Sequence, residues 1–114
     1  MTYTINGKEY TEFDINLRCA EIEGLELISD DVEVMAFDYL ESLIAGEDKF
    51  EVYVPCTDWN DAGHIVDKCW DELNQFVSGK QRMETKWIFT MQKHNCTKLV
   101  AACICYIEIN EAAL

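Results

Sequence analysis

The clearest periodic pattern of hydrophobic residues follows Asp58, where apolar positions return every three or four residues. In an α-helix this spacing places them on one face: Ala62, Ile65, Val66, Cys69, Leu73, Phe76 and Val77. Asp58 is suited to cap the first turn, and Asp61 complements the helix dipole there. We therefore predict a helix that begins after Asp58, ends at Ser78-Gly79 and buries this face.

The first ten residues carry the pattern of a β-hairpin. Two short runs rich in Tyr, Thr and Ile, between Thr2 and Tyr10, flank the pair Asn6-Gly7. Asn-Gly readily adopts the positive φ angles of a type I′ turn, whose twist matches that of paired strands. Because a two-stranded hairpin is only marginally stable alone, we expect it to pack against another element.

A second helix is predicted from Glu12 to Glu23. Thr11 and Asp14 have the spacing of a capping box, and Gly24 is suited to the left-handed residue that ends a helix. The apolar residues in this segment include a stripe at helical spacing: Phe13, Leu17 and Ala20. We expect this stripe to face the core.

Residues 32–46 support two interpretations. The first residues alternate as in a strand, whereas four apolar positions also fit the spacing of a helix: Val32, Met35, Tyr39 and Leu43. We favour a strand up to Phe37 and then a short helix. Asp38 and Glu41 have capping-box spacing at its start, and Gly46 ends it.

Residues 50–54 are predicted to form a half-buried strand. Their alternation places Phe50, Val52 and Val54 on the buried face and the two residues between them on the other. Pro55 cannot donate a backbone hydrogen bond, so it stops the strand.

Residues 85–91 are predicted to form another strand, because aromatic and β-branched residues dominate them. Three large apolar side chains would share one face: Trp87, Phe89 and Met91. A polar loop at residues 80–82 precedes this strand. A break at residues 93–96 follows it, with Asn95 as a candidate N-cap.

The run from Lys98 to Asn110 is apolar nearly all round. A helix with this composition has to be central and covered on most sides. The second half also alternates, so a strand is the alternative. We favour the helix because the run exceeds ordinary strand length and contains Ala101-Ala102.

Together these elements predict a single α+β domain spanning residues 1–114. We expect a small sandwich of about three helices packed on a mainly antiparallel sheet, with an N-terminal hairpin. The length suits one domain, and a hydrophobic content of 49% is sufficient for a buried core.

The net charge of the chain restricts the kinds of molecule that it can bind. The sequence holds 22 acidic and 9 basic residues, a formal net charge of -13. Such a surface repels phosphate backbones and anionic lipids, so direct binding to nucleic acid or membranes is disfavoured. It attracts basic proteins, whose nucleic-acid groove an acidic protein can occupy by mimicry. The alternative is that the charge only keeps the domain soluble.

The predicted location is the cytoplasm. The N-terminal residues do not form a signal peptide, and no apolar run approaches the roughly 18 residues of a membrane span. The six cysteines should therefore be reduced: Cys19, Cys56, Cys69, Cys96, Cys103 and Cys105. None forms a Cys-x-x-Cys pair, and most have apolar neighbours, so we interpret them as small hydrophobic residues. No cofactor is predicted.

Candidate catalytic or metal-binding residues are Cys56 and His64, which lie among several aspartates. A Cys/His enzyme needs the two side chains within hydrogen-bond reach. The competing interpretation is an exposed row of ion pairs on the helix, formed by Asp61, His64 and Lys68. His94 and Cys96 are too few ligands for a closed zinc site. We therefore predict no catalytic residue and no metal site.

Two further features have structural alternatives. Four basic residues cluster late in the chain, where we expect them to pair with acids rather than bind nucleic acid: Lys80, Arg82, Lys86 and Lys93. Trp59 at the start of a helix could form a binding platform. We expect instead that it packs against the preceding strand.

The segment from Pro55 to Ile65, Pro-Cys-Thr-Asp-Trp-Asn-Asp-Ala-Gly-His-Ile, resembles the NinX-like bacteriophage proteins, in which a strand end meets an Asp-Trp-x-Asp-Ala helix start. Residues 13–24 and 95–104 are similar to the first and last helices of that family. Cys96 replaces a proline, and residues 29–49 have no counterpart. The resemblance implies a phage or prophage accessory protein with an α/β sandwich, and it assigns no catalytic residues to this chain.

Our leading hypothesis is a non-enzymatic phage protein that binds a host or phage protein through an acidic face. The predicted interaction surface lies on the polar side of the helix after Asp58: Asn60, His64, Asp67, Asp71 and Glu72. The first alternative is a small Cys/His-dependent enzyme or metal-binding domain. The second is a self-associating structural protein with residues 99–109 at its subunit interface.

Overall fold

The computed structural model describes residues 1–30, 32–77 and 84–112. Its elements are β1 (Tyr3–Ile5), β2 (Lys8–Tyr10), α1 (Glu12–Glu23), β3 (Leu27–Ser29), β4 (Val34–Phe37), α2 (Tyr39–Ala45), β5 (Phe50–Val52), α3 (Trp59–Lys68), α4 (Trp70–Leu73), α5 (Lys86–His94) and α6 (Lys98–Ala112). The strands pair in two antiparallel sheets, β1-β2 and β3-β4-β5. The predicted α+β class and N-terminal hairpin are confirmed.

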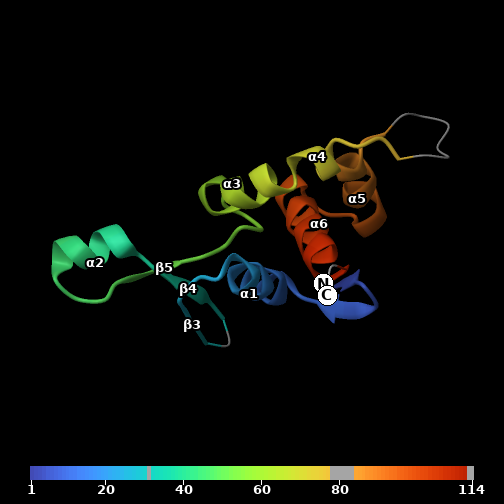
Figure 1. The fold of residues 1–114 in the computed structure, drawn as a ribbon. Coiled ribbons are helices and arrows are strands. Elements are labelled where there is room, and N and C mark those ends of the chain that lie inside the picture. The colour runs from blue at the N-terminus through green and yellow to red at the C-terminus, as the bar shows by residue number, and fades with distance from the viewer. Residues whose placement is uncertain (31, 78–83, 113–114) are drawn as a thin grey trace.

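Helix α6 forms the centre of the fold. It packs against α1, α3 and α5, which lie around it in Figure 1. Every residue from Leu99 to Ile107 is buried. The predicted central helix is thus confirmed, and the alternative strand is wrong. Because Leu99 to Ile107 are buried within their own chain, these residues are not exposed for self-association.

The hairpin has the turn that its sequence predicts. Asn6 and Gly7 both have positive φ angles, 51° and 80°. Tyr3, Ile5 and Tyr10 are buried, and β1 contacts α6. The hairpin therefore gains its stability by packing on the central helix, as expected for a two-stranded sheet.

Helix α1 has the predicted bounds, because its end signals are local. The Thr11 hydroxyl accepts from the Asp14 N–H (3.1 Å), and the Asp14 carboxylate accepts from the Thr11 N–H (2.9 Å). Gly24 follows in the left-handed conformation. The buried face differs from the predicted stripe. Phe13 and Leu17 are only partly buried, and the face consists of Ile15, Asn16, Cys19 and Ala20.

Residues 25–54 form an arm that extends away from the central helix. Strand β4 pairs with β3 and β5, and α2 lies in the connection from β4 to β5. Figure 1 shows α2 at the far end of the molecule, whose principal extents are 57, 26 and 25 Å. The preferred interpretation of residues 32–46, a strand followed by a short helix, is confirmed. Asp38 caps the helix, and Gly46 ends it.

The predicted buried face of β5 is wrong. Val52 is 42% exposed, whereas Tyr53, which was placed on the opposite face, is buried. The strand ends at Val52, and the Tyr53 N–H then donates to the Val34 carbonyl oxygen (2.8 Å). Tyr53 consequently joins the core instead of facing solvent.

The helix predicted after Asp58 begins as expected but breaks early. Its apolar face is buried as far as Leu73, with the first helix ending at Lys68 and α4 following. Phe76 is exposed and forms a bridge with Thr85. Backbone pairing with the segment before α5 thus replaces the last helical turn, and the predicted continuation of the helix through Val77 is wrong. The loop predicted at residues 80–82 lies outside the described residues.

The strand predicted at residues 85–91 is wrong, because α5 occupies this segment. The Thr85 hydroxyl caps it by accepting from the Ile88 N–H (3.3 Å). The inward residues have helical spacing: Trp87, Thr90 and Met91. Asn95 is the left-handed C-cap of α5, at φ 50°, and not an N-cap. Packing against α6 therefore overrides the strand preference of the aromatic and β-branched residues.

Candidate interaction surfaces

Cys56 and His64 lie in different environments. Cys56 is buried, its backbone N–H donates to Asn16 Oδ1 (3.1 Å), and its Sγ lies 3.9 Å from the Glu12 carbonyl oxygen. A hydrogen bond with the Cys103 thiol, together with burial, raises the pKa of Cys56 well above its usual range. His64 is exposed on α3. Cys/His chemistry requires an ionisable thiol within hydrogen-bond reach of the imidazole, and the raised pKa of Cys56 works against its ionisation.

The cysteines as a group behave as core residues. All six are free thiols, and Cys96 is the most exposed of them. Burial raises the pKa of Cys69 to about 12 and that of Cys96 to about 11. Within residues 1–30, 32–77 and 84–112, no set of three His, Cys, Asp or Glu side chains is arranged to hold a metal ion.

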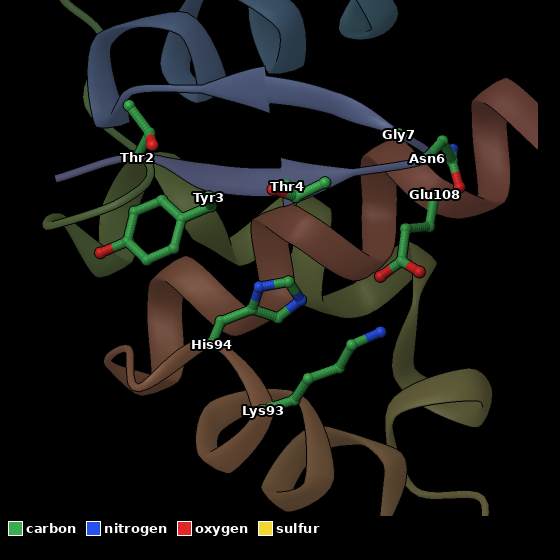
Figure 2. A pocket seen from close by; sticks show the side chains of 8 residues that line it. All are labelled: Thr2, Tyr3, Thr4, Asn6, Gly7, Lys93, His94 and Glu108. Atoms are coloured by element: carbon green, nitrogen blue, oxygen red, sulfur yellow. The ribbon is translucent and has the colours of Figure 1, made fainter.

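A cavity of about 610 Å³ lies between the hairpin and the end of α5 (Figure 2). Lys93 and His94 line one side, and Glu108 of α6 lines another. Burial lowers the pKa of His94, and the charge of Lys93 lowers it further. The imidazole edge meets the Tyr3 ring at a centroid distance of 6.3 Å. This cavity combines one cation with one carboxylate, so its charges do not select a ligand of either sign.

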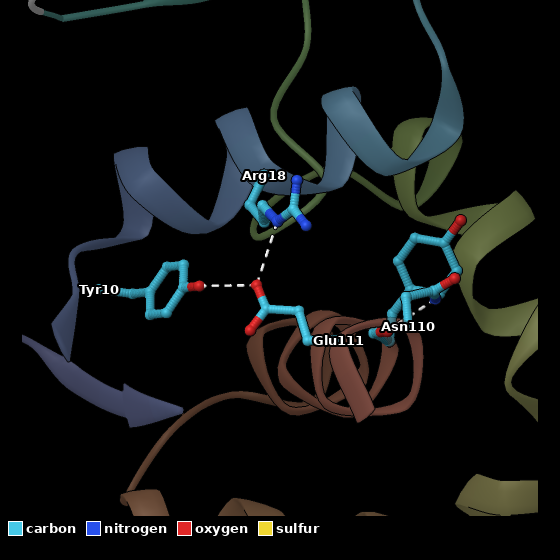
Figure 3. Close-up of polar contacts among 5 residues, drawn as sticks. Tyr10, Arg18, Asn110 and Glu111 are labelled. Atoms are coloured by element: carbon cyan, nitrogen blue, oxygen red, sulfur yellow. Dashed lines mark hydrogen bonds and ion pairs between the residues drawn. The ribbon is translucent and has the colours of Figure 1, made fainter. Parts of the chain in front are cut away.

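Glu111 joins three elements through one carboxylate oxygen (Figure 3). It accepts from the Tyr10 hydroxyl (2.9 Å) and from Arg18 Nε (3.1 Å). Burial alone would raise the pKa of Glu111, but these hydrogen bonds outweigh it, and the pKa is lowered. The hairpin, α1 and α6 are thereby held together, so we assign this cluster a structural role.

The predicted interaction surface on α3 and α4 is accessible but polar. Its members are exposed except for Glu72, which is half-buried. The predicted row of ion pairs does not form there. Lys68 pairs with Glu23 of α1, and Asp61 turns back to accept from the Val54 N–H (3.0 Å). The members of this surface are therefore polar or charged, and the exposed Trp70 lies between Asp67 and Asp71 in the sequence.

Trp59 is only half-buried. Its side chain is 54% exposed and borders a cavity of about 330 Å³ next to Leu99 at the start of α6. The exposed ring leaves the alternative of a binding platform open.

Helix α2 has no buried residue and carries a group of exposed apolar side chains. We define the apolar α2 face as Tyr39 (69% exposed), Leu40 (66%), Leu43 (61%) and Ile44 (72%). Positions three and four apart are neighbours on a helix surface, so the pairs Tyr39–Leu43, Leu40–Leu43 and Leu40–Ile44 link these side chains into a continuous stripe. Monomeric proteins rarely expose such patches unless they bind something. The sequence analysis did not single out this surface, because it placed the candidate interaction surface on the polar side of the helix after Asp58.

Polar contacts fix α2 on the arm. The Asp38 carboxylate accepts from the Glu41 N–H (3.0 Å), and the Ser42 hydroxyl accepts from the Lys49 N–H (2.8 Å). Phe37 and Phe50 pair across the strands below it with their rings edge to face at 5.6 Å. The helix is therefore positioned without burying its apolar face, which stays available for a partner.

We predict that Asp61→Asn becomes more stable relative to the wild type as the pH rises from about 3 to about 7. Burial raises the pKa of Asp61, and the hydrogen bond from Val54 lowers it only in part. A carboxyl with a raised pKa binds its proton more tightly when folded, so its contribution to stability falls with rising pH. Asparagine keeps an acceptor oxygen without the charge. Denaturant titrations at both pH values check this, and a difference that does not grow with pH would contradict it.

Comparisons with protein-family models, curated proteins and solved structures give no match to this chain. Among the described residues, no helix is long and apolar enough to cross a membrane.

Proposed function

We propose that this protein is a non-enzymatic accessory protein of a phage or prophage that acts in the bacterial cytoplasm by binding a host or phage protein. The observation that carries the binding role is the apolar α2 face, presented at the end of the arm. Burying this face on a partner would remove its four side chains from water, which favours association.

The charge and the family resemblance support the rest of the proposal. A net charge of -13 disfavours direct contact with nucleic acid and favours a basic protein. The resemblance of residues 55–65 to the NinX-like proteins favours a phage or prophage origin. An acidic protein with an apolar anchor is suited to cover the nucleic-acid groove of an enzyme, which would blunt a host defence or redirect a phage enzyme.

The experiment that tests this proposal compares capture of a partner by the wild type and by two variants. The first, called the triple alanine variant, is Leu40→Ala/Leu43→Ala/Ile44→Ala; alanine removes the apolar bulk and preserves helix propensity. The second is Asp67→Asn/Asp71→Asn, on the polar side of α3 and α4. Each protein is immobilised on a resin and incubated with lysate of the bacterium that carries the gene. The captured proteins are then quantified by mass spectrometry.

We expect the triple alanine variant to capture at least about tenfold less of the specific partner than the wild type. The reason is that apolar anchors at the centre of an interface dominate the binding energy. The α3 variant should retain it. Retention by the triple alanine variant with loss by the α3 variant would instead place the interaction on the surface that the sequence predicts. Absence of a specific partner for the wild type would contradict the proposed function itself.

A further inference from the structure

The arm provides space for a partner on both sides of Tyr39. One cavity of about 350 Å³ lies between Tyr39, Leu43 and the turn after Gly46. A second, of about 420 Å³, lies between Tyr39, Leu40 and strand β5. Each is large enough for apolar side chains, so the exposed stripe of α2 and its two hollows form one docking surface.

This docking surface has acidic surroundings. Residues 26–51 contain nine acidic residues and a single basic one, Lys49. The Lys49 ammonium already pairs with Glu47, at a distance of 2.7 Å between Nζ and Oε1. The described part of the arm therefore has no cation left to offset its carboxylates.

Two of these carboxylates lie against each other at the edge of the hollow beside Leu40. A hydrogen bond with Asp38, together with the repulsion of its charge, raises the pKa of Glu51. Asp61 lines the same hollow from α3. A cationic side chain placed next to this edge would relieve the repulsion, whereas another carboxylate would increase it.

We infer that the apolar α2 face docks a basic amphipathic segment of another protein, with apolar side chains on the α2 stripe and Lys or Arg side chains beside Asp38 and Glu51. The inference rests on the proposed binding function and names the chemistry of the partner. Charge complementarity selects this occupant over a second copy of the chain, because two copies would bring acidic arms together.

The test uses a synthetic amphipathic helix of leucine and lysine as the probe and a matched helix with glutamate in place of lysine. Binding to the purified protein is measured by fluorescence anisotropy at several salt concentrations. Three variants are compared with the wild type: the triple alanine variant, Asp38→Asn/Glu51→Gln and Asp67→Asn/Asp71→Asn. The last two remove the same charge, and asparagine still caps α2 at position 38.

We expect the lysine probe to bind and the glutamate probe not to bind. The triple alanine variant should weaken binding about tenfold, and Asp38→Asn/Glu51→Gln about threefold with a smaller salt dependence. The control Asp67→Asn/Asp71→Asn should change the affinity for the lysine probe by less than about twofold. Equal losses from the two charge-matched variants would show diffuse attraction to an acidic surface and overturn the inference.

Two other results would also overturn it. Equal binding of the glutamate probe would remove the requirement for a basic partner. A dimer of the wild type, seen by light scattering and abolished in the triple alanine variant, would make a second copy the occupant.

If the natural partner needs α2 for capture but the lysine probe does not compete, the proposed function stands and only the chemistry of the partner is wrong. If the probe binds α2 but capture of the natural partner does not need α2, the assignment of the natural binding surface to α2 fails, whereas the wild type still binds a partner.

Discussion

Ile104→Ala should lower the free energy of unfolding by about 2–5 kcal/mol. Ile104 is 0% exposed and lies in the middle of α6, which packs against α1, α3 and α5. Truncation removes buried methyl groups and leaves a cavity that three neighbouring helices cannot all close. Denaturant unfolding followed by far-ultraviolet circular dichroism measures the loss.

Ile44→Ala is the matched control, since the same atoms are removed from an exposed side chain of α2. We expect this variant to remain within about 0.5 kcal/mol of the wild type. A similar loss for Ile44→Ala and Ile104→Ala would mean that the α2 face contributes to the folding core, which would contradict its assignment as a binding surface.

Trp87→Ala should cost about 3–5 kcal/mol of unfolding free energy. The Trp87 ring is buried against the start of α6, where Nε1 donates to the Lys98 carbonyl oxygen (2.7 Å). The Lys98 ammonium lies 4.6 Å from the centre of the ring, and Trp70 packs edge-on against it. The substitution therefore removes a large apolar volume, a hydrogen bond and a cation–π contact together.

Two comparisons separate these contributions. Trp87→Phe keeps a ring but removes the indole N–H, so its loss should be smaller than that of Trp87→Ala. Trp59→Ala removes a half-exposed indole and should also cost less. If Trp59→Ala were as destabilising as Trp87→Ala, Trp59 would be a core residue and not a candidate platform.

Local signals in the sequence predict several element ends correctly. The Thr11–Asp14 box, the Asn6-Gly7 turn and the Asp38 cap each act over at most four residues, so neighbouring sequence contains all the required information. The all-round apolar run of α6 was also predictable, because only a central element can bury such a segment.

The errors arise where distant segments decide the structure. Residues 85–91 have strand-like composition, but Trp87 and Thr90 pack inward only in a helix that lies on α6. The end of α4 is set by pairing of Phe76 with Thr85, which are nine positions apart. Each of these contacts joins two segments, so the residues of one segment alone do not predict it.

The candidate binding site could not be found from periodicity alone. A stripe containing Leu40 and Leu43 predicts an apolar face, and in most domains such a face is covered by the core. Here α2 lies between β4 and β5, which carry it away from α6. Whether an apolar face meets its own chain or a partner depends on this tertiary arrangement.

The most direct test of the central claim combines partner capture with unfolding free energy in the triple alanine variant. We predict that capture falls at least about tenfold while the free energy of unfolding stays within about 1 kcal/mol of the wild type. A loss of stability as large as that of Ile104→Ala, or capture that remains undiminished, would contradict the claim that the apolar α2 face is a binding surface independent of the core.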